Sequence, residues 1–473
     1  MTFQTVPVNI AGPSYQDRSR PLAVQQTKNF YHEYVKSGKE QVVIKSFPGQ
    51  TEFGSSFAAD ERGAHVANET LYRVLGGTLY SVSAVGVHTS LGSILGSDRC
   101  IFADDGDNIF IVSNSVVYQY SISGGTLTTV TDANISGSQS VTFINNQFIY
   151  TKPSLSIVSD IGDGSSASGL NAVGAEANPD EIVRDYVFDQ IIYRFGKRTT
   201  ECWDNPGIGS PPIERITGLI FNVGLAGLHA VTASNQYIYW LGSDLSVLRA
   251  RRGDDQKIST TAISSALRGY STVADAFANH IILDGKSYIA FSFPTANKTW
   301  VVNEDFGEDG WFELSTGVTD GISNISSSVD CYNKPLVTDR TNGKIYQLDF
   351  DTYDIDGSLW QRRRTMGSIN SDLLGQKGKR VKMSRFELIL ETGTGLITGQ
   401  GEDPRIMLEA SYDGGRSWTE GTWMKIGRLG ETNAKAEWFN MKSFYDLIIR
   451  ITVTDPVAVN IYSGAIDLKL AGR

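Results

Sequence analysis

The chain has 473 residues, of which 40% are hydrophobic and 20% are charged, so it is long enough for two or three domains with substantial cores. Its formal net charge of -10 and its pI of about 5.1 argue against nucleic-acid binding over the whole surface, although they are compatible with a local basic patch. The three cysteines are scattered and form no CxxC pair, which indicates neither a disulfide framework nor a zinc site.

Residues 1–45 are predicted to form an N-terminal arm that precedes the repeated part of the chain. The opening run MTFQTVPVNIAGPSYQDRSRP has no apolar core of the length found in signal peptides. The most apolar stretch, GLIFNVGLAGLHAV from Gly218, is too short for a membrane span and carries an Asn and a His. We therefore expect a soluble protein without membrane insertion and without a visible export signal.

Residues 46–355 are predicted to form a β-propeller of six or seven blades. Runs of β-formers, a turn and an aromatic strand recur at intervals of about 35 to 55 residues, a spacing typical of propeller blades. Each run is a small antiparallel sheet that cannot cover both of its faces alone, and radial packing around an axis solves that problem. The Gly-Gly of LGGTLY and the Asn-Asn of INNQFIY suit hairpin positions with positive φ. The seven runs start at Thr70, Asn108, Ser140, Asp185, His229, His280 and Asp330.

The pattern changes after the predicted propeller. Residues 356–383 are polar, basic and rich in Gly and Ser, and we interpret them as a linker or an inserted interaction segment. Residues 384–473 contain alternating strands with turns at short intervals, which favours a compact β-sandwich. The predicted fold class is therefore all-β, a β-propeller followed by a C-terminal β-sandwich.

The stretch SYDGGRSW has the Ser-x-Asp-x-Gly-x-x-Trp skeleton of the Asp-box hairpin that recurs in sialidases. The Asp carboxylate is placed to accept backbone N–H groups across the turn, the Gly permits a left-handed residue, and the Trp is expected to pack beneath the turn. None of these roles is catalytic. We interpret the hairpin as structural, formed by Ser411, Asp413, Gly415 and Trp418.

No catalytic or metal-binding constellation can be read from the chain. There is no GxSxG motif, and the five histidines show no metal-ligand spacing such as HExxH. The acidic run Asp349 to Asp356 could bind calcium, but its spacing does not match an EF-hand loop, and solvated loop acids are the default interpretation. We predict a protein that is not an enzyme and has no cofactor and no metal ligands.

The chain is acidic overall but contains two clusters of basic residues. Such clusters are usually solvated surface residues, and the alternative interpretation is that they dock to an acidic partner or to DNA phosphates. The second cluster lies in the predicted linker, where docking is more plausible. The candidate contact residues are Arg249, Arg251 and Arg252 in the first cluster and Arg362, Arg363 and Arg364 in the second, which Lys377, Lys379, Arg380 and Lys382 follow.

An ordered series of N-terminal motifs resembles the packaged-DNA stabilisation proteins of short-tailed phages, the tail accessory or tail hub family. The series comprises GPSYQDRSRPLAVQQTKNFYHEYV from Gly12, KEQVVIKSFPGQTEFGS from Lys39 and ETLYRVLGGTLYSV from Glu69. GWFELSTG from Gly310 and the C-terminal strands, including DLIIRITVTDPVAVNIYSGAIDLKL, are similar to later segments of the family. The resemblance thus touches both ends and the middle of the chain.

The resemblance implies a structural virion protein located at the tail vertex and assembled in the host cytoplasm. It implies a ring of identical subunits, expected to be a homohexamer, that docks below the portal and head-completion adaptor. The ring would close the DNA channel after packaging, support the tail needle and the tailspikes or fibres, and let the packaged genome pass at ejection. An acidic channel would hold DNA loosely and favour its release.

A glycan-binding or glycan-cleaving propeller is the alternative. In that interpretation the Asp-box and the abundant aromatic residues serve sugar stacking, and Trp203 or Trp311 would be exposed on the binding face. Binding on a glycan array that is lost on mutating these tryptophans would support it. Cleavage is the weaker half of the alternative, because neither an arginine triad nor a nucleophile can be named.

Overall fold

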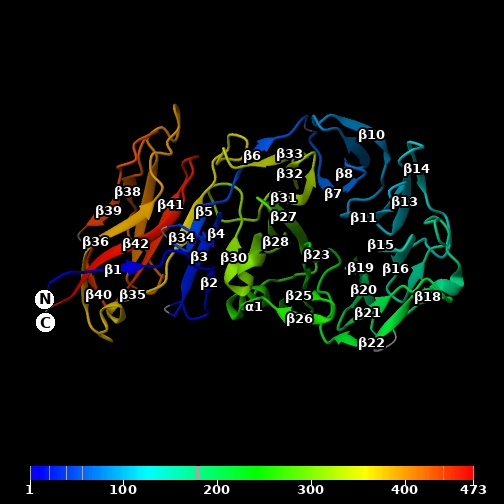
Figure 1. Ribbon diagram of the computed structural model, residues 1–473, viewed down its shortest axis with the longest axis horizontal. Coiled ribbons are helices and arrows are strands. Elements are labelled where there is room, and N and C mark those ends of the chain that lie inside the picture. The colour runs from blue at the N-terminus through cyan, green and yellow to red at the C-terminus, as the bar shows by residue number, and fades with distance from the viewer. Residues whose placement is uncertain are drawn as a thin grey trace.

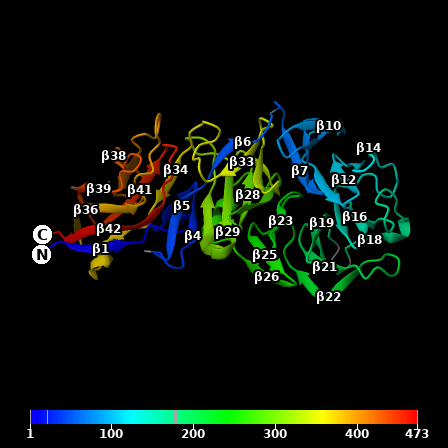
Figure 2. The same cartoon turned by 45° about the horizontal axis from the view of Figure 1, so that its top comes forward.

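The computed structural model describes residues 2–20, 22–38, 40–55, 57–175, 180–439 and 441–471. The other residues, which include the first residue of the predicted arm and the last two of the predicted sandwich, lie outside the described part. Figure 1 shows an elongated molecule with a ring of small sheets at one end and a second β-structure at the other. Both chain termini lie at the end opposite the ring (Figure 2).

The ring is a β-propeller, as the sequence predicts. Six four-stranded sheets stand alone among the described residues, and a seventh four-stranded unit belongs to a larger sheet and completes the ring. The first strands of successive units face one another, so they are the innermost strands. The first three units are β7 (Glu61–Ala67), β8 (Thr70–Leu75), β9 (Thr78–Val82) and β10 (His88–Ser93); β11 (Ile101–Asp104), β12 (Asn108–Ser113), β13 (Val116–Ser121) and β14 (Thr126–Thr129); and β15 (Ser140–Ile144), β16 (Gln147–Thr151), β17 (Ser156–Val158) and β18 (Ala172–Val173).

The remaining units follow in chain order, and the last closes the ring. They are β19 (Ile182–Phe188), β20 (Ile191–Gly196), β21 (Thr200–Asp204) and β22 (Glu214–Phe221); β23 (Val231–Ala233), β24 (Ile238–Leu241), β25 (Val247–Arg251) and β26 (Asp254–Lys257); β27 (Phe277–Leu283), β28 (Lys286–Phe293), β29 (Lys298–Asn303) and β30 (Trp311–Glu313); and β31 (Ile325–Cys331), β32 (Lys334–Asp339) and β33 (Ile345–Asp349) with β6 (Gly49–Glu52). Because β6 precedes the first unit in the chain, its pairing with β33 ties the two ends of the propeller together.

Tight hairpins connect the strands within the units. Asn145 and Asn146 join β15 to β16 with φ values of 48° and 63°. Consecutive residues with positive φ are the signature of the two-residue turn that matches the twist of an antiparallel pair. Asparagine tolerates this conformation better than most residues, which is why the Asn-Asn pair predicts the turn.

The second β-structure is a sandwich whose core contains residues from both ends of the chain. One sheet has the order β39-β36-β42-β5-β4, with β1 and β40 on its edges. Its strands are β1 (Gln4–Val8), β4 (Phe30–Tyr34), β5 (Val42–Ser46), β36 (Val381–Leu390), β39 (Ala436–Phe439), β40 (Ser443–Phe444) and β42 (Ile461–Leu470). Ile10, Phe30 and Ile44 are fully buried in the same apolar cluster as Phe386 and Ile449. The residues predicted as an arm therefore complete the core of the sandwich.

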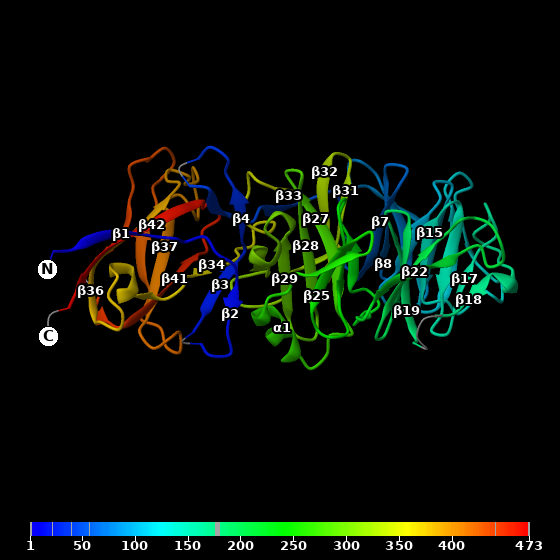
Figure 3. The ribbon, with the colours of Figure 1, turned by 60° about the horizontal axis from the view of Figure 1, so that its bottom comes forward.

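The other sheet of the sandwich is continuous with a propeller blade. It runs β27-β28-β29-β30-β3-β34-β41-β37-β38, with β2 and β35 on side branches. The strands not yet bounded are β2 (Tyr15–Gln16), β3 (Val24–Lys28), β34 (Arg362–Thr365), β35 (Ile369–Asn370), β37 (Arg405–Ser411), β38 (Thr422–Lys425) and β41 (Asp446–Val453). Figure 3 shows β3 and β34 between the propeller and the sandwich. The predicted linker 356–383 thus contributes strands to this sheet, and the boundaries at 46, 356 and 384 stay predictions.

Helical structure is sparse in the described part of the chain. It consists of α1 (Thr261–Arg268) and three 3₁₀ turns, η1 (Gly169–Asn171), η2 (Glu304–Gly310) and η3 (Ser371–Leu374). The Thr260 hydroxyl caps α1 by accepting a hydrogen bond from Ile263 N at 3.3 Å, and Ile263 and Leu267 are buried. No described helix has the length and apolarity required to cross a membrane.

Candidate functional site: the junction of propeller and sandwich

The arginine triplet of the predicted linker lies on β34, at the centre of the continuous sheet. Side chains of a strand alternate between its two faces, so Arg362 and Arg364 share one face and Arg363 takes the other. Arg362 and Arg364 are at most 1% exposed, whereas the side chain of Arg363 is 18% exposed. The prediction that Arg362 and Arg364 contact a partner or DNA is therefore wrong, because both guanidinium groups are enclosed by the protein.

The Arg364 guanidinium ties the N-terminal segment to β34. It donates to Ile10 O at 2.7 Å, Gly12 O at 2.8 Å and Thr27 Oγ1 at 2.7 Å. No carboxylate pairs with it in the described residues, so its charge is compensated by oxygen dipoles alone. Burial lowers the pKa of Arg364 to about 9, which still leaves the side chain charged at neutral pH.

The Arg362 guanidinium ties β34 to the segment between β41 and β42 and to the end of β5. Its Nη1 donates to Ser46 Oγ at 2.9 Å and to Val457 O at 2.5 Å, and its Nη2 donates to Asp455 O. Burial lowers the pKa of Arg362 to about 10. The two buried arginines thus bind backbone carbonyls of segments that lie far apart in the sequence.

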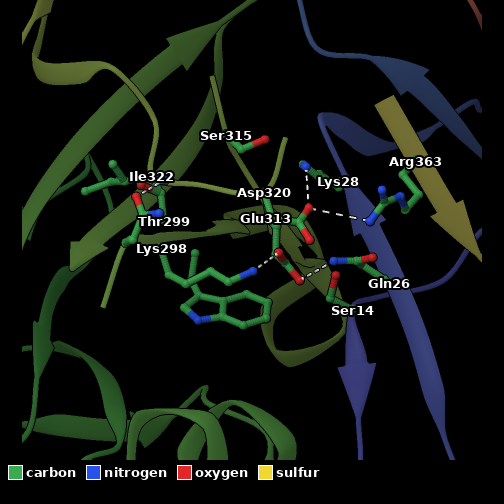
Figure 4. A network of polar contacts seen from close by, with 12 residues as sticks. Ser14, Gln26, Lys28, Lys298, Thr299, Glu313, Ser315, Asp320, Ile322 and Arg363 are labelled. Carbon is green, nitrogen blue, oxygen red and sulfur yellow. Dashed lines mark hydrogen bonds and ion pairs between the residues drawn. The ribbon is translucent and has the colours of Figure 1, made fainter. Parts of the chain in front are cut away.

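The opposite face of β3 and β34 carries a network of charges between the propeller and the sandwich (Figure 4). Lys28 Nζ lies 2.6 Å from Asp320 Oδ1, and Arg363 Nη1 lies 3.5 Å from the same oxygen. Burial lowers the pKa of Lys28 despite the hydrogen bond to Asp320. Burial opposes ionisation of Asp320, but Lys28 and Arg363 prevail and lower its pKa. The two cations thus favour the ionised form of the Asp320 carboxylate.

Glu313 of β30 extends the network into the propeller. Gln26 Nε2 donates to Glu313 Oε1 at 2.9 Å, and Lys298 Nζ lies 2.8 Å from Glu313 Oε2. Asn29 adds a backbone connection, since its Nδ2 donates to Gln361 O at 2.7 Å and its Oδ1 accepts from Ser315 N at 2.8 Å. Sequence reasoning missed Gln26, Lys28 and Asn29 because their partners lie about 290 to 330 positions away. The only local signal is an Asn directly after a strand.

The first basic cluster lies on the outer part of the fifth blade. Arg249 stacks over the Tyr237 ring at 4.5 Å and donates to Gln256 Oε1 at 2.8 Å. Arg252 pairs with Asp189 at 2.8 Å, and Arg251 is exposed. Two of the three charges are thus held by neighbouring side chains, and a partner contact by this cluster stays a prediction.

The SYDGGRSW stretch forms a hairpin centred on the Asp413 carboxylate. Its Oδ1 accepts from the backbone N of Arg416 and of Ser417, each at 2.9 Å, and from Ser411 Oγ at 2.8 Å. Hydrogen bonds from Ser417 and Ser411 hold the pKa of Asp413 well below its usual range. Gly415 has a φ of 82°, and the Trp418 ring stacks against the guanidinium of Arg450 at 4.0 Å. Each of these residues takes part in a structural contact.

The aromatic residues named for sugar stacking are in the core. Trp203 is 1% exposed and Trp311 is 0% exposed. Trp203 Nε1 donates to Glu201 Oε2 at 3.0 Å, and Trp311 Nε1 donates to Ile258 O at 2.8 Å. The prediction that they are exposed is wrong, because both faces of a blade strand are covered by adjacent blades.

The acidic run that starts at the end of β33 has protein partners for three of its carboxylates. Asp349 Oδ1 accepts from Asp351 N at 2.9 Å, Asp354 Oδ1 accepts from Gly357 N at 3.0 Å, and Asp356 pairs with Lys344 at 2.5 Å. Over the described ranges no group of three or more His, Cys, Asp or Glu side chains could hold a metal ion.

Comparison with known protein families decides the affiliation of the chain. The family model described as bacteriophage P22 Gp10, beta-propeller, matches residues 4–353, and the model described as bacteriophage P22 Gp10, beta-sandwich, matches residues 368–469. The chain belongs to the phage P22 Gp10 family. It is thus a phage stabilisation protein of the Gp10 type, with the propeller and the sandwich in the order that the sequence predicts. The Gp10 family is a family of structural phage proteins.

Solved structures share only a general likeness with this Gp10 relative. The designed protein Ika8 has a TM-score of 0.39 and 13% identity over 69% of this chain and 99% of its own. PorZ of Porphyromonas gingivalis has a TM-score of 0.38 and 12% identity, over 65% of this chain and 38% of its own. The N-terminal domain of Nup159 has a TM-score of 0.40 and 11% identity, over 69% of this chain and 99% of its own. No curated protein sequence matches the chain.

Proposed function

We propose that six copies of this chain form a ring at the tail vertex of the virion, below the portal and the head-completion adaptor. The observation that carries the proposal is the match of both Gp10 family models, in order, to almost the whole chain. The ring closes the DNA channel after packaging and supports the tail needle and the tailspikes or fibres. Its subunits are assembled in the host cytoplasm and act without catalysing a reaction.

The physical character of the junction supports a load-carrying role. A hub subunit must transmit force between neighbours without changing shape, and a continuous sheet with buried guanidinium contacts resists bending at the junction. Exposed charges on the propeller rim, such as Arg251, offer contact points for acidic partners. A permanent ring interface of this kind buries about 2,000 Å² or more.

Electron microscopy of the purified chain mixed with a portal–adaptor assembly tests the proposal. We expect a six-fold ring on the assembly, and light scattering should show an added mass close to six times the 51.7 kDa of one chain. Arg251→Glu should weaken ring docking if the first basic cluster contacts a partner, with Arg416→Glu in the exposed hairpin as the matched control. A chain that stays monomeric beside the assembly would contradict the proposal.

A further inference from the structure

The propeller encloses a cavity of about 550 Å³ at one end of its axis. Residues of six blades line the cavity, and only the axis lies within reach of so many blades. Its polar lining residues lie near the ends of blade strands. Glu61 begins an innermost strand, Arg340 follows a second strand, and the others come shortly before an innermost strand: Arg99, Gln139, His229 and Asp275. We call this space the axial cavity. It belongs to neither the junction nor the hairpin.

Two arginines of the axial cavity have no carboxylate partner in the described residues. Arg99 donates to Ser326 Oγ and Ser326 O, each at 2.9 Å, and stacks over the Phe277 ring at 4.0 Å. The Arg340 side chain makes no hydrogen bond or ion pair within the described part of the chain, and its buried Nε has no acceptor. The positive charge of Arg340 adds to burial in lowering the pKa of Arg99 to about 10. Attraction to Glu61 opposes this shift, although the two groups form no ion pair. Two arginines without an ion-pair partner among the described residues therefore face the same space.

A third arginine, Arg184, lies beside the cavity, and a histidine, His229, lines its wall. Arg184 donates to Leu228 O at 3.1 Å, and its buried Nε has no acceptor. Burial, together with the charges of Arg99 and Arg184, holds the pKa of His229 well below its usual range. His229 is thus neutral at pH 7, and its ring adds no charge of its own.

The cavity wall also contains carboxylates, and none of them forms an ion pair with Arg99 or Arg340 within the described part of the chain. Glu61 is engaged with Arg73, whose Nε lies 2.7 Å from Glu61 Oε2, and Glu61 Oε1 has no donor. Asp275 accepts from Thr295 N at 2.7 Å through Oδ2, while its buried Oδ1 has no donor. Asp98 is exposed at the rim. The wall therefore has unused acceptors as well as unused donors.

A buried polar group without a partner is costly, and a ligand that satisfies such groups gains that energy on binding. Carboxylates satisfy arginines best, because each hydrogen bond is charge-assisted. Backbone N–H groups satisfy carboxylate oxygens, and a peptide carries both kinds of group. The cavity volume lies in the range of small-ligand sites, about 300–1,000 Å³, which suits a few residues of peptide and is too small for a DNA duplex.

We propose that the axial cavity binds an acidic peptide segment of another protein, with Arg99 and Arg340 receiving its carboxylates and Asp275 accepting from its backbone. Val112, Leu228 and Phe277 supply an apolar wall for the aliphatic part of the segment. The inference goes beyond the ring proposal and does not depend on it, since the isolated chain contains the whole cavity.

Titration calorimetry on the full chain tests this site with a nine-residue peptide of alternating Glu and Gly. We expect one peptide per chain with a Kd of about 0.1 mM or tighter, and at least tenfold weaker binding of the same peptide with Gln in place of Glu. Arg340→Ala should weaken binding at least tenfold, and we expect it to fold because this side chain makes no hydrogen bond or ion pair within the described part of the chain. Arg251→Ala, which removes an exposed arginine elsewhere, should leave binding unchanged.

Several results would overturn the proposal. They are equal binding of the Glu and Gln peptides, no binding by the wild-type chain at a peptide concentration of about 1 mM, and an unchanged Kd in Arg340→Ala. Binding of inorganic phosphate without binding of the Glu peptide would also overturn it, because the cavity would then hold a simple anion. Melting curves of each variant, recorded beside the titrations, separate loss of binding from loss of fold.

Discussion

At the scale of single residues, Arg362 and Arg364 were expected to contact a partner, and the structure shows that they hold distant segments of the chain together. Each guanidinium is buried and donates to backbone carbonyls or hydroxyls, with no carboxylate partner in the described residues. A planar group with five donors suits this task, because several carbonyls from different segments converge on it. Removal of the side chain takes a donor away from each of those oxygens in a dry interior, and a buried acceptor that loses its donor destabilises the fold.

Replacing Arg364 should therefore destabilise the protein strongly. We expect Arg364→Met to lower the free energy of unfolding by about 3 kcal/mol or more, because Ile10 O, Gly12 O and Thr27 Oγ1 each lose a charge-assisted hydrogen bond. Urea denaturation monitored by tryptophan fluorescence measures the change. Arg251→Met, at an exposed position, should change stability by less than about 0.5 kcal/mol. Equal stability of the two variants would contradict the assigned role of Arg364.

His32 should make the fold sensitive to acid. Burial, with the charge of Arg364, lowers the pKa of His32 to about 4 from an ordinary value of 6.5. The unfolded chain thus binds a proton at a higher pH than the folded chain, so the contribution is present above pH 6.5 and is lost as pH falls toward 4. We expect the free energy of unfolding to be about 2 kcal/mol lower at pH 5 than at pH 7 from this residue.

Denaturation curves at pH 7 and pH 5 check this sign. His32→Gln cannot be protonated, so its loss of stability between the two pH values should be smaller than that of the wild type. His88, whose pKa burial also lowers to about 4, should retain its own share of the acid sensitivity in the variant. An identical pH dependence of wild type and variant would show that His32 is not the titrating group.

At the scale of elements, the N-terminal strands are part of the sandwich rather than an appendage. β1 and β5 pair with β42, and β3 pairs with β34, although these partners lie at the other end of the chain. Ile10, Phe30 and Ile44 enter the apolar cluster formed by the C-terminal strands. The sandwich core cannot close until both ends of the chain are present.

Truncating Phe30 should consequently destabilise the C-terminal strands. Phe30→Ala removes a fully buried ring, and we expect a loss of about 3–5 kcal/mol in the free energy of unfolding. Hydrogen exchange should rise in β36, β41 and β42 more than in the propeller blades. Phe3→Ala is the matched control, because Phe3 is 39% exposed and should cost less than about 1 kcal/mol. Faster exchange confined to the propeller would argue against a shared core.

At the scale of the whole molecule, one sheet links the propeller and the sandwich into a single body. Strand β3 lies between β30 of the propeller and β34 of the sandwich, and the Lys28–Asp320 pair sits beside it. A rigid connection suits the proposed ring, in which each subunit would hold its neighbours at fixed positions. The same connection couples the stabilities of the two parts, since neither can lose β3 without exposing an edge and a set of buried polar groups.

Calorimetry should detect that coupling. We expect the wild-type chain to unfold in one transition and Thr27→Pro to unfold in two, because proline has no N–H group and its ring disrupts a strand that is paired on both sides. Thr27→Ser keeps the backbone donor and the hydroxyl that bonds Arg364 and Gly12, and it serves as the control that retains one transition. Two separate transitions in the wild type would show that the continuous sheet does not couple the two parts.

Much of the fold could be predicted from local patterns. The alternating runs mark the blades, and the Asn145–Asn146 pair marks a hairpin whose two residues have positive φ. The burial of single side chains was less predictable. Trp203 was expected to be exposed and Arg362 to contact a partner, but both are buried. Whether a strand side chain faces water depends on the sheet that packs against it, and the strand's own sequence does not contain that information.

The sequence by itself determined the strands, their turns and the family, because alternation, turn residues and motif order are properties of short segments. Only the tertiary structure decided which distant segments join, such as Arg364 with Ile10, 354 positions apart. It also decided that β6 closes the propeller and that six blades converge on the axial cavity. These pairings arise because strand edges and buried polar groups are stable only when they are paired, and the folded chain as a whole selects their partners.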